Sequence, residues 1–239
     1  MLWWVFVVQE APPLFSSIDY ALLTPHSEYG PTEYMQGWGK KWFDEHMRLK
    51  MAQRLVNVRV ELCEKFWCKD TSITSRSIEC PAEMARNFVA RSMSAGASQE
   101  ILLAEALWVK SLYSTLANAY KIPFLRDHAA EDGEHETQRI NAFLNHGNYL
   151  AYGLASVALN ALGISYSFAL LHGKTRRGAL VFDVADLIKD GLILPLAFEY
   201  GTDPRKTEKD YRCELIDRLQ TSKALDILFD VVKSIATEP

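Results

Sequence analysis

The sequence of 239 residues predicts a mainly α-helical fold with one short β-strand near its N-terminus. Two observations support this prediction. Apolar residues recur at three-, four- and seven-residue steps over several long stretches, as they do on the buried face of a helix. Aromatic and β-branched residues of strand type gather in residues 2–8, with 179–182 as a second candidate strand.

The composition is that of a globular protein with a sizeable core. Hydrophobic residues make up 49% of the chain and charged residues 23%, which argues against a disordered protein. The net charge of -4 argues mildly against a nucleic-acid-binding protein, although affinity for phosphate depends on where the cations lie. The cysteines form no CxxC motif and indicate reduced thiols in a cytoplasmic protein; they are Cys63, Cys68, Cys80 and Cys213.

The N-terminal segment differs from the rest of the chain. Residues 2–8, LWWVFVV, are too few to span a membrane and lack the preceding basic residue of a signal peptide, so we interpret them as a buried strand. This strand has no partner nearby in the sequence, so either another chain pairs with it or sequence that belongs before it is missing. We therefore expect a remnant strand and linker at 1–31 and a helical domain at 32–239.

The helical part is divided by loops that are rich in polar residues, proline or glycine. Apolar periodicity, N-cap residues and prolines set the expected limits of each helix. The predicted elements are a long helix from Thr32 to about Phe66, a polar loop at 69–81, a short helix from Pro81 to about Met93, a helix from about Gln99 to Tyr120 with Ser98 as N-cap, a charged surface loop at 126–140, a helix from about Asn141 to Leu162 that Gly163 ends, a helix from about Val184 that is interrupted near Pro195, and an amphipathic helix from about Glu208 to Ile235.

A carboxylate lies on the apolar face of one predicted helix. In ILLAEALWVKSLY the apolar stripe consists of Ile101, Trp108, Leu112 and Leu116, and Glu105 falls on the same face. A bare buried carboxylate is costly and tends to be protonated. Glu105 therefore needs a cation, which is either a basic side chain in a buried salt bridge or a metal ion.

The segment LLHGKTRRGALVFDVADLIKD, residues 170–190, supplies a second group of candidates. His172 follows an apolar run, where a lone histidine is more often a hydrogen-bonded core residue than a ligand. Asp183 and Asp186 are three residues apart, on one face of a helix that starts near Asp183. One aspartate could cap that helix, but two aspartates and a histidine are better explained by Mg²⁺ or Mn²⁺. Asp190 continues the face, and we expect it nearer to water.

Basic residues lie between the histidine and the aspartates. The stretch GKTRRG contains Lys174, Arg176 and Arg177 beside two glycines. A solvated basic loop is one interpretation. The other is a clamp for phosphate next to the metal, because arginine side chains and the backbone amides of glycine bind phosphate well. A metal beside a phosphate clamp is what phosphodiester chemistry needs.

Two further clusters are weaker metal candidates. In EDGEHE, residues 131–136, Asp132 and His135 have the three-residue spacing of di-iron helices, but Gly133 lies between them and no apolar stripe surrounds them. Such charge runs are usually solvated. His146 is a further candidate ligand, and helix packing explains it equally well.

With Glu105, His172, Asp183 and Asp186 identified, the chain resembles the CRISPR adaptation integrase, the Cas-one family, in its type I-F branch. The resemblance covers the chain from about residue 5 to its end. The last two of the four matching blocks are long and specific. The blocks are LTPHSEYGPTEY (23–34), AEALWVKSLY (104–113), FLNHGNYLAYGLA (143–155) and LHGKTRRGALVFDVADLIKDGLILPLAF (171–198).

The resemblance implies an all-α catalytic domain with a divalent metal held by Glu105, His172 and Asp186, with Asp183 in support. It implies a metal-dependent DNA endonuclease and integrase that inserts foreign DNA fragments, or spacers, into the CRISPR array. The 3′ hydroxyl of the fragment attacks the CRISPR repeat in a transesterification. It further implies a homodimer and a partner, the Cas-two protein, which in type I-F is fused to the helicase–nuclease Cas-three.

The chain differs from the family at its N-terminus. The family carries a β-rich domain there that makes much of the homodimer, and LWWVFVVQEAPPLF resembles only its last strand and exit linker. Three hypotheses follow: an integrase, a truncated DNA- or partner-binding fragment of it that is not productive, or an unrelated metal phosphohydrolase with small substrates.

Overall fold

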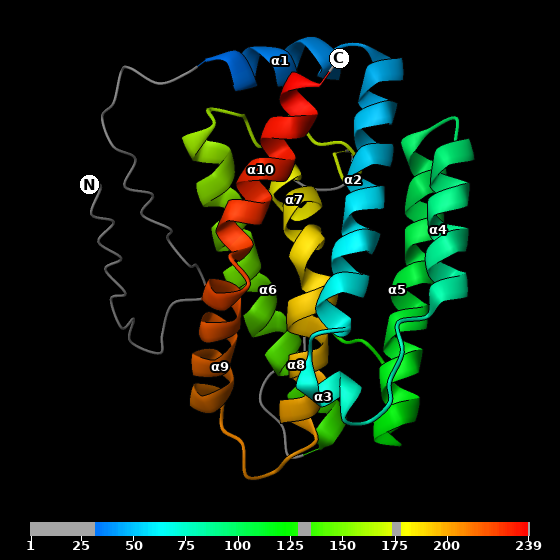
Figure 1. The fold of residues 1–239 in the computed structure, drawn as a ribbon, viewed down its shortest axis with the longest axis vertical. Helices are drawn as coiled ribbons and strands as arrows, with labels where there is room; N and C mark the ends of the chain where they lie inside the picture. Colours follow the sequence, from blue (N-terminus) through cyan, green and yellow to red (C-terminus); the bar gives the residue numbers. More distant parts are fainter. Residues whose placement is uncertain (1–31, 129–134, 174–177, 239) are drawn as a thin grey trace. The chain divides into compact units, whose positions relative to one another are not determined.

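The computed structural model describes residues 32–128, 135–173 and 178–238, and over these residues the fold is all-α (Figure 1). The predicted strand at residues 2–8 lies outside the described residues. The helices are α1 (Glu33–Trp42), α2 (Glu45–Trp67), α3 (Thr71–Thr74), α4 (Ala82–Ser94), α5 (Ser98–Tyr120), α6 (Glu136–Ala161), α7 (Leu180–Ile188), the π-helical turn η1 (Lys189–Ile193), α8 (Leu194–Gly201), α9 (Glu208–Thr221) and α10 (Ala224–Thr237).

The column formed by α7, η1 and α8 lies at the centre of the helical part. Helices α2, α6 and α10 pack around α7, and α5 and α6 contact α8 (Figure 1). The sequence of the column, LVFDVADLIKDGLILPLAF, is apolar on nearly every side, which is typical of a helix that is buried all round. Leu180, Val184, Ile188 and Leu196 are accordingly fully buried. The few charged residues of this column are therefore forced into the interior.

The predicted apolar stripe of α5 is confirmed. Ile101, Trp108, Leu112 and Leu116 are all completely buried, and Glu105 is buried among them at 8% exposure. On the opposite face of the helix, Leu103 and Leu107 are exposed. The stripe packs α5 against α4, α2 and α8, so Glu105 points into the domain rather than into water.

Two predicted long helices are each divided in the structure. The first breaks between α1 and α2, where Asp44 leaves the helical conformation and its side chain accepts hydrogen bonds from the amides of His46 and Met47. The last breaks between α9 and α10, where Lys223 adopts a left-handed conformation with φ of 56°. In both places the apolar pattern continues across the break, so the spacing of apolar residues alone does not reveal where the helix is divided.

Other limits differ from the prediction by short segments. Residues 180–182 begin α7 and form no strand, because the helix starts before the aspartates. The loop at 69–81 contains the short helix α3, capped by Asp70. Ser98 is the first residue of α5 and caps nothing, since Ala97 occupies the N-cap position. Residues 136–140 of the predicted surface loop belong to the first turns of α6.

The predicted interruption near Pro195 is present as the π-helical turn η1. Proline has no amide hydrogen and its ring crowds the preceding turn, so a regular α-helix cannot pass through it. The extra residue in each turn of η1 takes up this mismatch, and Pro195 lies in the first turn of α8, directly after Leu194. The turn changes the direction in which the side chains of Lys189 and Asp190 point.

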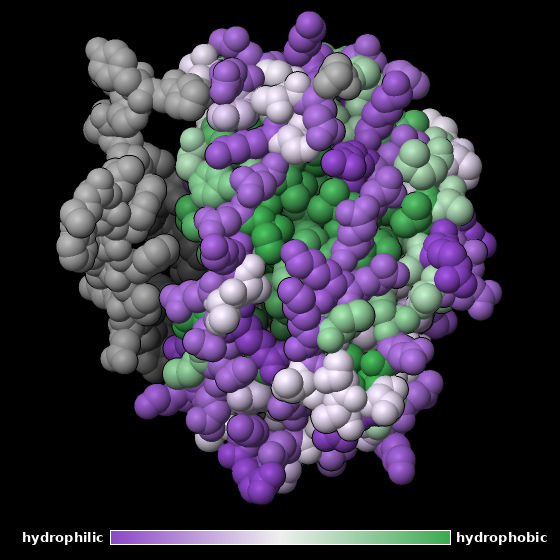
Figure 2. All heavy atoms as spheres, viewed as in Figure 1, coloured by the Kyte–Doolittle hydropathy of each residue, from purple (hydrophilic) through white to green (hydrophobic). Residues whose placement is uncertain are grey.

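Hydrophobic residues also reach the surface of the domain. Figure 2 shows them gathered between charged side chains, over the region between α2 and α10. Among the described helices, none combines the length and the apolar character needed to cross a membrane.

Candidate metal centre

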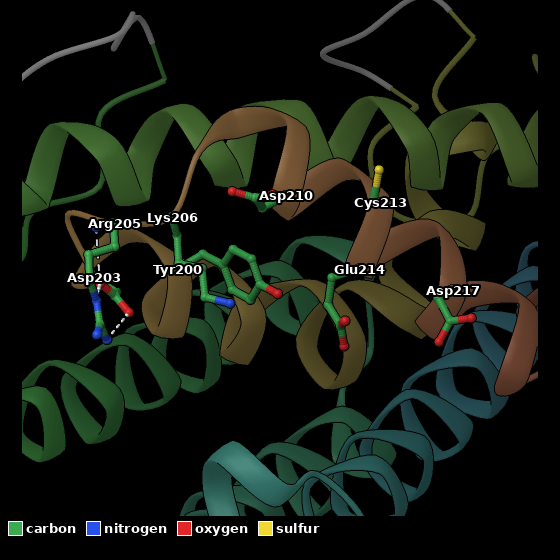
Figure 3. A pocket seen from close by; sticks show the side chains of 8 residues that line it. All are labelled: Tyr200, Asp203, Arg205, Lys206, Asp210, Cys213, Glu214 and Asp217. Carbon is green, nitrogen blue, oxygen red and sulfur yellow. Dashed lines mark hydrogen bonds and ion pairs between the residues drawn. The ribbon is translucent and has the colours of Figure 1, made fainter.

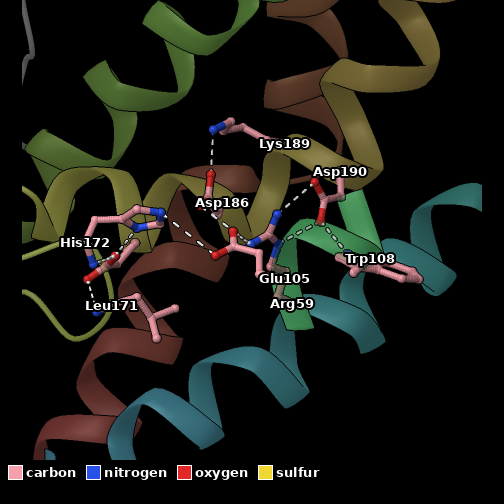
Figure 4. Close-up of polar contacts among 9 residues, drawn as sticks. Arg59, Glu105, Trp108, Leu171, His172, Asp186, Lys189 and Asp190 are labelled. Atoms are coloured by element: carbon pink, nitrogen blue, oxygen red, sulfur yellow. Dashed lines mark hydrogen bonds and ion pairs between the residues drawn. The ribbon is translucent and has the colours of Figure 1, made fainter. Parts of the chain in front are cut away.

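The buried charges of the described residues form a single cluster. Five charged residues are buried there, and all five lie within the same group: Arg59, Glu105, Asp183, Asp186 and Asp190. Figure 4 labels four of them, all but Asp183, beside His172 and Lys189. They come from α2, α5, α7 and η1, which the fold brings together although up to 131 positions separate them in sequence. Burying so many charges is costly, so each of them needs a partner.

His172 is held in place by Asp183. The Nδ1 atom of His172 donates a hydrogen bond to Asp183 Oδ1 at 2.7 Å, and the amide of His172 donates to the same oxygen at 3.2 Å. The amides of Leu170 and Leu171 donate to Asp183 Oδ2 at 2.7 and 3.1 Å. Because a carboxylate only accepts hydrogen bonds, Nδ1 carries a proton, and in the neutral imidazole the lone pair is therefore on Nε2. Asp183 thus fixes both the loop and the tautomer of His172.

The Nε2 atom of His172 faces the buried carboxylate of α5. His172 Nε2 lies 3.8 Å from Glu105 Oε2, and Asp186 approaches from α7 (Figure 4). One ligand atom from each of Glu105, His172 and Asp186 can be chosen so that all three lie within 4.8 Å of one another. The His172 side chain is 23% exposed, whereas those of Glu105 and Asp186 are about 10% exposed. The group therefore opens towards solvent on the histidine side.

Two basic side chains contact the same carboxylates. Lys189 Nζ donates to Asp186 Oδ1 at 2.5 Å, and its amine lies 5.3 Å from the centre of the Tyr152 ring. Arg59 Nη1 donates to Glu105 Oε1 and lies 3.6 Å from Asp186 Oδ2. The buried salt bridge considered for Glu105 is therefore present, and it occupies one of its two oxygens.

Arg59 is anchored on its other side by Asp190. The Nε and Nη2 atoms of Arg59 donate to the two oxygens of Asp190 at 2.7 and 3.1 Å. The indole of Trp108 donates to Asp190 Oδ2 at 3.0 Å, and that of Trp67 donates to the Asp190 carbonyl at 2.9 Å. The prediction that Asp190 lies near water is wrong, because it is buried within η1 against Arg59.

Burial and neighbouring charges shift the pKa values of three groups in the cluster. Burial would lower the pKa of Arg59, but Asp190, Asp186 and Glu105 together raise it well above its usual value. Burial would raise the pKa of Asp186, yet the charges of Lys189 and Arg59 outweigh this and lower it. The hydrogen bond to Asp183 raises the pKa of His172, against the opposite effect of burial.

The residues present fit a divalent cation. The cluster contains four carboxylates, those of Glu105, Asp183, Asp186 and Asp190, and two cations, Arg59 and Lys189, which pair with Glu105, Asp186 and Asp190. Two negative charges are left over when His172 is neutral, which is the charge that one divalent ion balances. Two carboxylates and one imidazole are ligands that Mg²⁺ and Mn²⁺ accept, and Asp183 on the far nitrogen of His172 is the usual support of a metal-binding histidine.

Arg59 and Lys189 were not among the residues predicted from the sequence. A signal for Arg59 exists, because it lies seven residues after Ala52 and three after Val56, on the same buried face of α2. A charged residue in an apolar stripe is the pattern that identified Glu105. A signal for Lys189 exists too, because it lies three residues after Asp186, a spacing at which opposite charges pair on a helix.

The other predicted candidates lie apart from this centre or outside the described residues. The basic residues Lys174, Arg176 and Arg177 lie outside the described residues, and so does Asp132 of the EDGEHE stretch. His135 occupies the N-cap position of α6 and is exposed. His146 forms an ion pair with Glu208 of α9 at 3.3 Å.

A separate hollow of about 730 Å³ lies beside α9 and the end of α8 (Figure 3). Its walls carry both signs of charge, and Arg205 is paired with Asp203 at 2.9 Å. It contains none of the residues of the metal centre. The residues that line it are Tyr200, Asp203, Arg205, Lys206, Asp210, Cys213, Glu214 and Asp217.

The described helices form an all-α domain with a candidate metal centre of Glu105, His172 and Asp186. The profile of the family described as CRISPR associated protein Cas1 matches residues 21–217. The chain belongs to this family.

Curated relatives cover nearly the whole chain. A CRISPR-associated endonuclease Cas1 from Pseudomonas aeruginosa is 42% identical over 233 residues, which are 94% of this chain and 70% of the relative. The protein of the same name from Pectobacterium atrosepticum is 39% identical over 236 residues, which are 95% of this chain and 71% of the relative.

Solved structures share the fold at low sequence identity. A CAS1 protein from Thermotoga maritima has a TM-score of 0.65 at 14% identity and covers 90% of this chain and 74% of its own. TtCas1 in complex with DNA has a TM-score of 0.61 at 19% identity, with 87% of this chain and 67% of its own covered. These likenesses agree with the predicted helical fold.

Proposed function

We propose that this chain is a metal-dependent DNA endonuclease and integrase of CRISPR adaptation, which inserts foreign DNA fragments into the CRISPR array. The observation that supports it most is the convergence of Glu105, His172 and Asp186, whose ligand atoms come within 4.8 Å of one another. Membership of the Cas1 family, whose curated relatives are named endonucleases, supports the same reaction class.

The proposed ligands are Glu105, His172 and Asp186, and the proposed metal is Mg²⁺ or Mn²⁺. A bound divalent ion would polarise a phosphodiester and lower the pKa of an attacking hydroxyl or water. Asp183 accepts the Nδ1 proton of His172 and aims Nε2 at Glu105, so the neutral imidazole would present its Nε2 lone pair to the ion. Of the three ligands, His172 is the most exposed, so the DNA is expected to approach from its side.

DNA and protein partners are part of the proposal. Lys174, Arg176 and Arg177 lie two to five residues after His172 in the sequence, which would place their charges near the phosphates of bound DNA. The solved TtCas1–DNA complex shares the fold. A solved casposase bound to its integration product shares it as well, with a TM-score of 0.60 at 13% identity. That match covers 88% of this chain and 67% of the casposase chain. We further propose the type I-F branch, homodimerisation, and a Cas-two or Cas-two/three partner. We also propose a cytoplasmic location, because the cysteines are free thiols and the cytoplasm keeps thiols reduced.

The test compares two histidine variants. We expect H172A to lose Mn²⁺-dependent DNA cleavage and strand transfer by at least about 100-fold, because it removes a proposed ligand. H146A is the matched control, since His146 is paired with Glu208 away from the centre. Unchanged activity of H172A would contradict the assignment. A wild-type chain that binds DNA but transfers no strand would favour the alternative, a DNA- or partner-binding fragment.

A further inference from the structure

The two proposed carboxylate ligands are each held by a cation of the protein itself. Glu105 Oε1 accepts a hydrogen bond from Arg59 Nη1, while Glu105 Oε2 faces His172 Nε2. Asp186 Oδ1 accepts a hydrogen bond from Lys189 Nζ at 2.5 Å, while Asp186 Oδ2 lies 3.6 Å from Arg59 Nη1. Each carboxylate thus has one oxygen hydrogen-bonded to a cation, while its other oxygen faces His172 in Glu105 and lies at the longer distance of 3.6 Å from Arg59 in Asp186.

These cations are fixed from the protein side. Arg59 is 5% exposed, and two of its nitrogens are held by Asp190, which Trp108 holds in turn. Lys189 begins η1, and its amine lies over the ring of Tyr152 on α6. Neither position depends on a bound ion, so both cations would remain beside the carboxylates when an ion binds.

Divalent cations differ in how they use carboxylates. Ca²⁺ takes six to eight oxygens and often binds both oxygens of a carboxylate, in flexible geometry. Mg²⁺ requires an octahedron of short bonds, and such a site usually takes one oxygen from each carboxylate and keeps several waters. A carboxylate with one oxygen already bound to arginine or lysine suits the second kind of ion better than the first.

We propose that Arg59 and Lys189 are specificity-determining residues, which limit Glu105 and Asp186 to one metal-binding oxygen each and so make the centre select Mg²⁺ and Mn²⁺ over Ca²⁺. This inference rests on the proposed metal-dependent function and adds to it the basis of ion selection. It assigns a role to two cations that otherwise reduce the negative charge available to the metal.

The experiment measures competition between ions without using activity. Binding of Mn²⁺ to the intact chain is followed through the electron paramagnetic resonance signal of the free ion, and Ca²⁺ is added as competitor. We expect the Ca²⁺ concentration that displaces half of the Mn²⁺ to fall by about tenfold or more in K189Q and in R59Q, the scale typical of changes next to a metal ligand. We expect K189R to keep the wild-type ratio.

The matched control is R218Q. Arg218 also binds several carboxylates, those of Asp70, Glu199 and Glu214, but it joins α9 to α3 and α8 away from the centre. Its replacement should leave the ratio of Ca²⁺ to Mn²⁺ unchanged. Lys189 has a 22% exposed side chain, so K189Q provides the test even if R59Q fails to fold.

The outcomes separate this inference from the proposed function. A K189Q variant that binds Mn²⁺ and loses it to Ca²⁺ at the wild-type concentration would overturn the role of Lys189 and with it the selection mechanism. Wild-type protein that binds no Mn²⁺, or an H172A variant that binds it equally well, would overturn the metal centre itself and the selection mechanism together.

Discussion

At the scale of single residues, Asp183 connects the fold to the chemistry. It is buried at 1% exposure, and its two oxygens accept bonds from three consecutive amides and from the ring of His172. A single side chain therefore shapes the loop at 170–172 and directs His172 Nε2 towards Glu105. Such support of a metal-binding histidine usually affects metal affinity strongly.

We expect D183N to lower the free energy of unfolding by about 3 kcal/mol, because the new amide nitrogen faces N–H donors and leaves buried groups without partners. We also expect it to weaken Mn²⁺ binding by about 10- to 100-fold. Urea unfolding and Mn²⁺ titration measure the two effects. D70N is the control: it removes a charge that caps α3 and binds Arg218, so it should lower stability but keep Mn²⁺ affinity. Equal Mn²⁺ affinity in D183N and wild type would contradict the role given to Asp183.

At the scale of elements, the long apolar stripes could be predicted, but the breaks and the turn geometry could not. The face of α5 and the burial of Glu105 follow from three- and four-residue spacing, which is a local property. The orientation of Asp190 follows from η1, where one extra residue per turn shifts the register. The partner of Glu105, Arg59, lies 46 positions away, and pairing over such a distance depends on packing rather than on local pattern.

The π-helical turn itself depends on a close contact. Gly191 of η1 lies against Phe66 of α2, and a Cβ atom built on it would meet the Phe66 ring at 2.6 Å. We expect G191A to lower the free energy of unfolding by about 1–3 kcal/mol through this overpacking. Because Lys189 and Asp190 lie in the same turn, Mn²⁺ affinity should fall as well.

The control for this variant is G153A. Gly153 lies within α6, and nothing is found within 4 Å of its added Cβ. Alanine favours a helix interior over glycine by about 1 kcal/mol, so G153A should unfold at equal or higher urea concentration than wild type. If G191A were as stable as G153A, Phe66 would have to move easily and η1 would not depend on this contact.

At the scale of the whole helical domain, the central column carries both the core and the charges. Residues of α7 and α8 such as Val184 and Leu196 are fully buried, while Asp183, Asp186 and Asp190 extend from the same column into the cluster. The excess of carboxylates over basic side chains therefore lies in the interior, where like charges repel strongly. Stability and metal binding should be coupled for this reason.

We expect Mn²⁺ to raise the unfolding temperature of the wild-type chain and EDTA to reverse this. An ion that binds only the folded state at 100 times its dissociation constant adds about 2.7 kcal/mol, which corresponds to several degrees for a protein of this size. H172A should lose this shift, because it removes a ligand, while H146A should keep it, because His146 is paired with Glu208. The difference between the variants makes the test specific, because a nonspecific ion effect would shift the unfolding temperature of all three proteins equally. That result would show that the buried charges are balanced within the chain without a metal.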